Sequence, residues 1–124
     1  MSQYPPPEAP ATVTTFPITT AFDFVEYRTV RTLGSCFGLV VRSMGAIRGL
    51  GASFKALAGG EVGQYTKLLE DSRRHAMDRL IENARLMGAN AVVGMRFDSS
   101  EIGQSLTEIA AYGTAVVVEA RPPS

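Results

Sequence analysis

The positions between Tyr65 and Met87 follow the repeat of an α-helix. Apolar or small residues recur there every three or four positions, which places them on one side of a helix. They are Tyr65, Leu69, Ser72, Ala76, Leu80, Ala84 and Met87. Gly88 comes next and suits the left-handed conformation that ends many helices. The pattern predicts one substantial helix, whose small residues let it lie close to a sheet.

Four other runs are rich in β-branched and aromatic residues, as strands are. They are Phe24–Leu33, Cys36–Ser43, Ala91–Ser99 and Leu106–Ala120. The first two form either a hairpin or one bent strand. The last two form an antiparallel pair, because a link of about six residues is too short for a parallel crossover. In the Gly-rich stretch between the early runs and the helix, we expect a short helix over residues 52–58.

Alternation within the strands assigns their faces. Phe37, Leu39 and Val41 share one face, and Cys36 lies on the opposite one. In the third run, residues 91, 93, 95 and 97 share a face. The last strand is apolar on both faces, with Ile109, Ala111, Ala115 and Val117 on one side and Tyr112, Val116 and Val118 on the other. We expect Val40 and Val92 to add to this second side.

One helix covers only one face of such a sheet. The second face would then be an exposed apolar surface, and symmetric homo-oligomers commonly bury surfaces of that kind. We therefore expect the chain to assemble with copies of itself. The alternative is that residues 1–24 fold back over the second face.

The two ends of the chain differ from its centre. Residues 1–22 are rich in Pro and Thr, which disfavour a packed core, and we expect a flexible tail. A polyproline ligand for a protein partner is the functional alternative for this segment. Residues 121–124 form a second, shorter tail. The domain organisation predicted is thus one α+β domain over residues 23–120.

Composition excludes several classes of protein. The chain has 124 residues, with 12 Lys and Arg against 12 Asp and Glu, one Cys and one His. A single Cys excludes a scaffold held by intrachain disulfides. Zero net charge argues against binding to nucleic acid or membranes through bulk electrostatics. With no signal peptide and no long apolar segment, we expect a cytoplasmic protein.

The helix and the strand after it carry a resemblance to a known family. The pattern runs from Tyr65 through Leu69, Arg73, Ala76, Leu80 and Ala84 to the sequence Gly88-Ala89-Asn90-Ala91-Val92-Val93-Gly94. It resembles the YbjQ-like family of small bacterial proteins, labelled "putative heavy-metal-binding domain", over roughly residues 32–120. The resemblance implies a β-α-β-β core with an antiparallel sheet and one main helix. It also implies assembly as a symmetric ring, with a pentamer favoured.

Heavy metals prefer several thiolate or imidazole ligands. Cys36 and His75 are the only such side chains in the chain. A site made from them therefore requires ring symmetry to repeat each ligand. Asp71, Asp78 and Glu82 share a predicted helical face with His75 and are candidate ligands for a divalent ion. The nearby arginines would repel a cation, so a solvated helix face is the simpler interpretation.

No pair of residues in the sequence indicates catalysis. We therefore predict a non-enzymatic, homo-oligomeric binding or scaffold domain with no cofactor. The alternative is a heavy-metal-binding or metal-stress protein whose site forms only in the oligomer, from Cys36, His75, Asp71 or Asp78.

Overall fold

The computed structural model describes residues 15–43, 63–103 and 106–122. Its elements are strand β1 (Tyr27–Ser43), helix α3 (Gly63–Leu86), strand β2 (Ala91–Ile102) and strand β3 (Leu106–Ala120). The sheet has the order β1-β3-β2, and both pairs are antiparallel. This confirms the α+β prediction of an antiparallel sheet with one main helix. The short helix expected over residues 52–58 lies outside the described residues.

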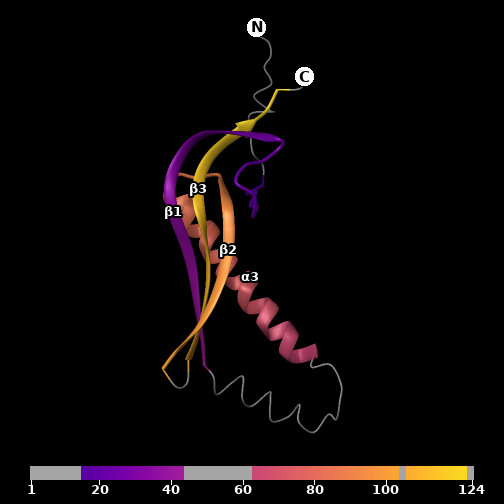
Figure 1. Ribbon diagram of the computed structural model, residues 1–124, viewed down its shortest axis with the longest axis vertical. Coiled ribbons are helices and arrows are strands. Elements are labelled where there is room, and N and C mark those ends of the chain that lie inside the picture. Colours follow the sequence, from indigo (N-terminus) through magenta and orange to yellow (C-terminus); the bar gives the residue numbers. More distant parts are fainter. Residues whose placement is uncertain (1–14, 44–62, 104–105, 123–124) are drawn as a thin grey trace.

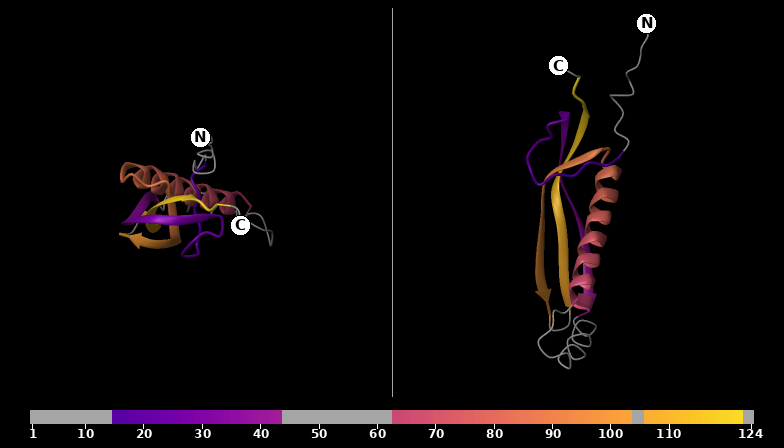
Figure 2. Two further views of the ribbon diagram at one scale, coloured as in Figure 1. Left: turned by 90° about the horizontal axis from the view of Figure 1, so that it is seen from above. Right: turned by 90° about the vertical axis from the view of Figure 1, so that its right-hand side faces the viewer.

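Helix α3 packs along one face of the sheet, mainly over β1, and leaves the other face to the opposite side of the molecule (Figures 1 and 2). The helix ends as the sequence predicts. Gly88 has a φ of 93°, its N–H donates to the Arg85 carbonyl, and the Ala89 N–H donates to the Ala84 carbonyl. This is the Schellman arrangement, which satisfies carbonyls at a helix end. Within the described residues, no helix is long and apolar enough to cross a membrane.

The two early runs form one long bent strand, so the hairpin alternative is wrong. Irregularities in the β1–β3 register fall between Thr29 and Arg31 and between Thr32 and Gly34. Gly34 has a φ of 119°, a conformation that side chains disfavour. The strand therefore bends at Gly34 without reversing.

The faces of β1 are opposite to what we expected, because we placed Val40 on the second, uncovered face. Val40 and Cys36 are buried against α3, whereas Phe37, Leu39 and Val41 lie on the exposed face. Gly38 explains this arrangement. A Cβ atom at Gly38 would collide with the backbone of Ala76 and Leu80 and lie 2.8 Å from the Arg79 carbonyl carbon. The helix thus touches the strand backbone itself, and only the face that carries glycine permits that approach.

A bulge in β2 breaks the alternation expected for that strand. The register with β3 shifts between Val93 and Arg96, and Gly94 has a φ of 64°. Ala91 and Val93 therefore face away from the helix, whereas Met95 and Phe97 pack on its side. The expectation that these four residues share one face is wrong, as is the placement of Val92 on the second face.

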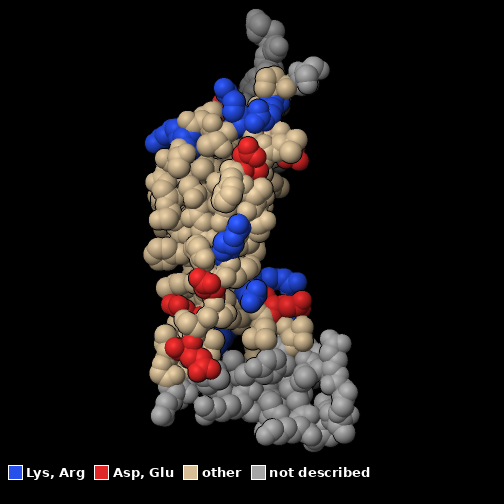
Figure 3. All heavy atoms as spheres, in the orientation of Figure 1, with Lys and Arg blue, Asp and Glu red and all other residues tan. Residues whose placement is uncertain are grey.

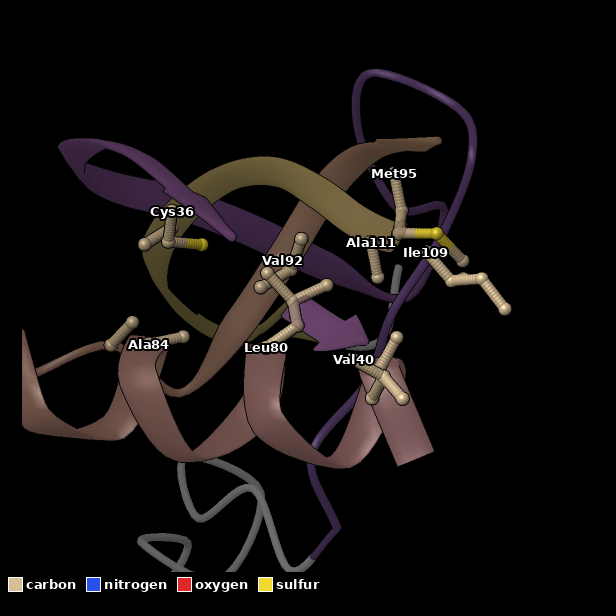
Figure 4. Packing of buried hydrophobic residues seen from close by; sticks show 11 residues of the cluster. Cys36, Val40, Leu80, Ala84, Val92, Met95, Ile109 and Ala111 are labelled. Atoms are coloured by element: carbon tan, nitrogen blue, oxygen red, sulfur yellow. The ribbon is translucent and has the colours of Figure 1, made fainter. Parts of the chain in front are cut away.

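The main core lies between α3 and the sheet (Figure 4). It is thin because its helix side consists mostly of small residues: Ser72, Ala76 and Ala84 are buried beside the larger Leu80. Leu69 and Met87, which we expected in the same stripe, are exposed. A second cluster lies on the other face, where Phe24 and Tyr27 cover Val93, Val116 and Val118. Of the described residues before β1, Phe24 helps to cover that face, as the alternative for residues 1–24 proposed.

Residues 17–21 run beside the first half of β2 and make backbone hydrogen bonds to it. The Val92 N–H donates to the Pro17 carbonyl, the Thr19 N–H to the Val92 carbonyl, and the Gly94 N–H to the Ala21 carbonyl. This stretch is therefore ordered against the sheet, in contrast to the flexible tail expected for residues 1–22. Free backbone groups at the edge of β2 explain the pairing, since Pro and Thr are compatible with an added edge strand.

We predict that Gly38→Ala lowers the free energy of unfolding by about 3 kcal/mol, because the added methyl forces the helix away from β1. Urea unfolding followed by circular dichroism measures the change. Ser35→Ala, at an exposed position of the same strand, is the control and should change stability by less than about 0.5 kcal/mol. Equal stability of the two variants would contradict the close packing.

A second prediction concerns Asn90, whose side-chain amide pairs with the backbone of Val118 at 2.8 and 2.9 Å. Val118 is buried, so Asn90→Ala leaves one donor and one acceptor unsatisfied and should cost about 3 kcal/mol. Asn83→Ala removes one exposed amide bond to the Phe37 carbonyl. It should cost about 1 kcal/mol or less in the same unfolding experiment. Similar losses for both variants would show that Asn90 has no special role.

Candidate functional site

Cys36, the first metal-ligand candidate, points into the core between the sheet and α3 (Figure 4). Its side chain is only 3% exposed, and burial raises the pKa of the thiol. Both facts disfavour the thiolate, which is the form that binds metals. The thiol does not face the second sheet surface, where ring symmetry was expected to repeat it.

The other candidates lie on the surface of α3. Asp71 forms ion pairs with Lys67 at 3.4 Å and with Arg74 at 3.5 Å. His75, Asp78 and Glu82 line an open groove of about 990 Å³ along the helix. Phe16, Arg79 and Arg85 also line this groove. Three of the four candidates thus share a helical face, as predicted. Arg79 and Arg85 lie on the same groove and would repel a cation.

These residues do not fit a heavy-metal site within one protomer. In the described part of the chain, no three His, Cys, Asp or Glu side chains come together as a possible metal cluster. The only Cys of the chain is buried under α3, and the only His is exposed where that helix passes the edge strand β1. A soft metal ion would therefore lack a thiolate ligand at the helix surface.

The sequence analysis missed a cluster around Arg42. The Arg42 Nε donates to the Ser72 Oγ at 2.9 Å, and its Nη2 lies 3.3 Å from the His75 Nδ1. Ser72 is 1% exposed and donates in turn to the Leu68 carbonyl. The available signal was Ser72 itself, a polar residue in a buried helical stripe. Its partner is 30 positions away and becomes visible only when the strand register is known.

The uncovered sheet face carries an apolar patch formed by Phe37, Leu39, Val41 and Tyr112. Phe37 lies directly opposite Tyr112 in the register, and the exposed fractions of Phe37 and Val41 are 55% and 50%. Figure 3 shows this face, since the sheet lies in front of α3 in that view. Uncharged side chains fill most of the middle of this face, while charged ones gather near both its upper and its lower end. The sequence predicted an apolar patch on this face that included Tyr112. It placed Val40 of β1 there, whereas the structure places Phe37, Leu39 and Val41 there.

Comparisons with known proteins agree with this fold. The family described as "Putative heavy-metal-binding" (YbjQ) matches residues 16–119. A UPF0145 protein of Bradyrhizobium sp. is 57% identical over 102 residues, covering 82% of this chain and 92% of its own. One from Burkholderia multivorans is 48% identical over 112 residues, covering 90% and 92%. The names of these relatives state no reaction.

A solved structure shows the same fold at low sequence identity. This protein of unknown function from Pediococcus pentosaceus, assigned to the DUF74 family, superposes with a TM-score of 0.52 at 14% identity. The match covers 82% of this chain and 95% of the other. The family match and the two relatives each extend over most of the chain. The chain therefore belongs to the YbjQ-like family of UPF0145 proteins.

Proposed function

We propose that the chain is a cytoplasmic, non-enzymatic binding or scaffold domain that works as a homo-oligomer. The observation that carries this proposal is the apolar patch of Phe37, Leu39, Val41 and Tyr112 on the sheet face opposite α3. The free thiol of Cys36 fits a reducing compartment.

The surroundings of the patch support an interface. Phe37 pairs with Tyr112, and Leu39 pairs with Ala110 on the central strand. On the other side of β3, Arg96 of β2 pairs with Tyr112 and Asp98 pairs with Ala110, and both charged residues are exposed. An apolar centre bordered by charged residues is the usual anatomy of a surface that binds another protein. A second copy of this chain offers a patch of the same composition.

The position of β1 adds a second argument. It is an edge strand of 17 residues, and among the described elements only β3 pairs with it. Exposed edges of this length tend to pair with another strand unless an assembly covers them. A ring of copies would cover both the edge and the adjacent patch. The resemblance to the family favours a pentamer.

The alternative, a metal site formed only in the ring, has less support. Cys36 is enclosed by its own helix and sheet, so a neighbouring copy reaches its sulfur only if the core opens. That leaves His75 as the one imidazole or thiol ligand that copies could share, and its Nδ1 lies 3.3 Å from Arg42 Nη2. The donor set in the described residues therefore fits hydrogen bonding to anions better than metal coordination.

We predict that Phe37→Glu disrupts assembly, because it places a charge in the proposed interface. The concentration at which the oligomer dissociates should rise at least about tenfold, measured by native mass spectrometry and sedimentation. Folding should persist, since the side chain is already exposed in the protomer.

The control is Leu86→Glu on α3, which adds the same charge at an exposed apolar side chain outside both the patch and the β1 edge. It should leave the mass of the assembly unchanged. A wild-type protein that is monomeric at all concentrations, or a Phe37→Glu variant that assembles normally, would contradict the proposal.

A further prediction distinguishes the scaffold proposal from the alternative of a metal site formed in the oligomer. Native mass spectrometry after addition of Zn²⁺, Ni²⁺ or Cu⁺ should show no whole-number metal uptake per oligomer that depends on Cys36. Cys36→Ser and wild-type protein should therefore give the same spectra. Stoichiometric uptake that disappears in Cys36→Ser, while the oligomer stays intact, would instead establish the metal-binding function.

A further inference from the structure

A small pocket lies where the edge strand β1 passes the middle of α3. Its volume is about 420 Å³, and it is lined by Leu39, Val40, Val41, Arg42, His75 and Arg79. We refer to it as the basic pocket. Its apolar residues all come from β1, whereas its polar side chains are two arginines and one histidine. No carboxylate is among the described residues that line it.

Arg42 is held in place by the core. Its Nε is bonded to the hydroxyl of Ser72, which is almost fully buried and is itself tied to the Leu68 carbonyl by a 2.9 Å hydrogen bond. Among the described residues, no carboxylate forms an ion pair with Arg42. The guanidinium is therefore fixed in direction, and no carboxylate of the described residues neutralises its charge, a preorganisation that favours an anionic ligand.

The contact with His75 sets the proton position on its ring. Arginine can only donate hydrogen bonds, so the Arg42 Nη2 contact to the His75 Nδ1 requires an unprotonated Nδ1. The proton of a neutral ring then lies on Nε2, which becomes a donor. Arg42, His75 and Arg79 thus all present hydrogen-bond donors around one opening.

The acidic residues of the helix are directed elsewhere or lie beside the pocket. Asp71 pairs with Lys67 and Arg74. Asp78 and Glu82 line the neighbouring groove, which shares His75 and Arg79 with the basic pocket. In the described part of the chain, Arg79 forms no ion pair with either of them. Its guanidinium therefore has no fixed carboxylate partner competing with a ligand.

We propose that the basic pocket binds a small organic oxyanion, a carboxylate or a phosphate monoester. The charged group would accept hydrogen bonds from Arg42, His75 and Arg79, because guanidinium donors match the geometry of such oxygens. The carbon part of the ligand would lie along β1 at Val40, the apolar lining residue whose side chain is on the helix side of the sheet. The pocket adjoins the proposed oligomer interface, because Leu39 and Val41 border both, but its charged side chains lie on the helix side of β1.

The single histidine allows a direct test on the full chain. The ring C–H resonances of His75 are observed by NMR without further assignment, while inorganic phosphate and then n-butyl phosphate are added at constant pH and ionic strength. We expect a saturable shift with both probes. Binding of butyl phosphate should be at least about fourfold tighter, because it buries additional methylene groups.

Variants assign the response to the pocket. Arg79→Gln removes a donor that supports no other described contact, and Arg42→Gln removes the central one. Each should weaken binding about tenfold or more. Arg31→Gln, an exposed arginine on the same strand, is the matched control and should bind as wild type does.

Several outcomes would overturn the proposal. A shift that grows linearly with phosphate, or one that is equally weakened in Arg31→Gln, would show only a general salt effect. Equal affinity for phosphate and butyl phosphate would exclude an organic ligand whose carbon part lies against β1. Loss of binding in Arg79→Gln that accompanies a change in oligomer mass would assign the arginine to an interface between copies. Native mass spectrometry of the same samples decides that last point.

Discussion

The rest of the structure depends on the contact between the backbones of β1 and α3 at Gly38. A side chain at this position would collide with the helix, so the two elements approach as closely as polypeptide chains can. The helix contributes Ala76 and Ala84 there, and β3 contributes Ala111 and Gly113 on the same side of the sheet. Interiors are packed without gaps, so a core this thin has room for few large residues. The larger apolar residues of β1 therefore lie on the opposite face.

That constraint explains which parts of the fold could be predicted. The helix repeat, its glycine end and the antiparallel β2–β3 pair depend on local spacing, and the structure confirms all three. Which face of β1 is buried does not depend on local spacing, because strand alternation defines two sets of residues without saying which set faces the core. We had placed Val40 on the face away from the helix. The decisive residue was Gly38, whose absent side chain marks the side on which the helix lies.

The same limit applies to the candidate sites. Sequence spacing correctly placed His75, Asp78 and Glu82 along one surface of α3, because helix geometry is local. It misplaced Cys36, since that prediction required the orientation of β1. The Arg42–Ser72 contact joins elements whose relative position depends on Gly38 and the strand register. A chain with zero net charge thus still concentrates unneutralised donors in one place, which a count of charges does not reveal.

The hydrogen bonds between residues 17–21 and the first half of β2 cover a strand edge on which other chains could pair. An uncovered strand edge is a template on which identical chains can add without limit. Here the chain covers that part of the β2 edge with its own backbone, which leaves β1 as the longer open edge. Growth by repeated addition needs two compatible edges, so the early segment stops such growth at one side. Proteolytic loss of that segment would leave backbone groups of β2 free to pair with a strand of another chain.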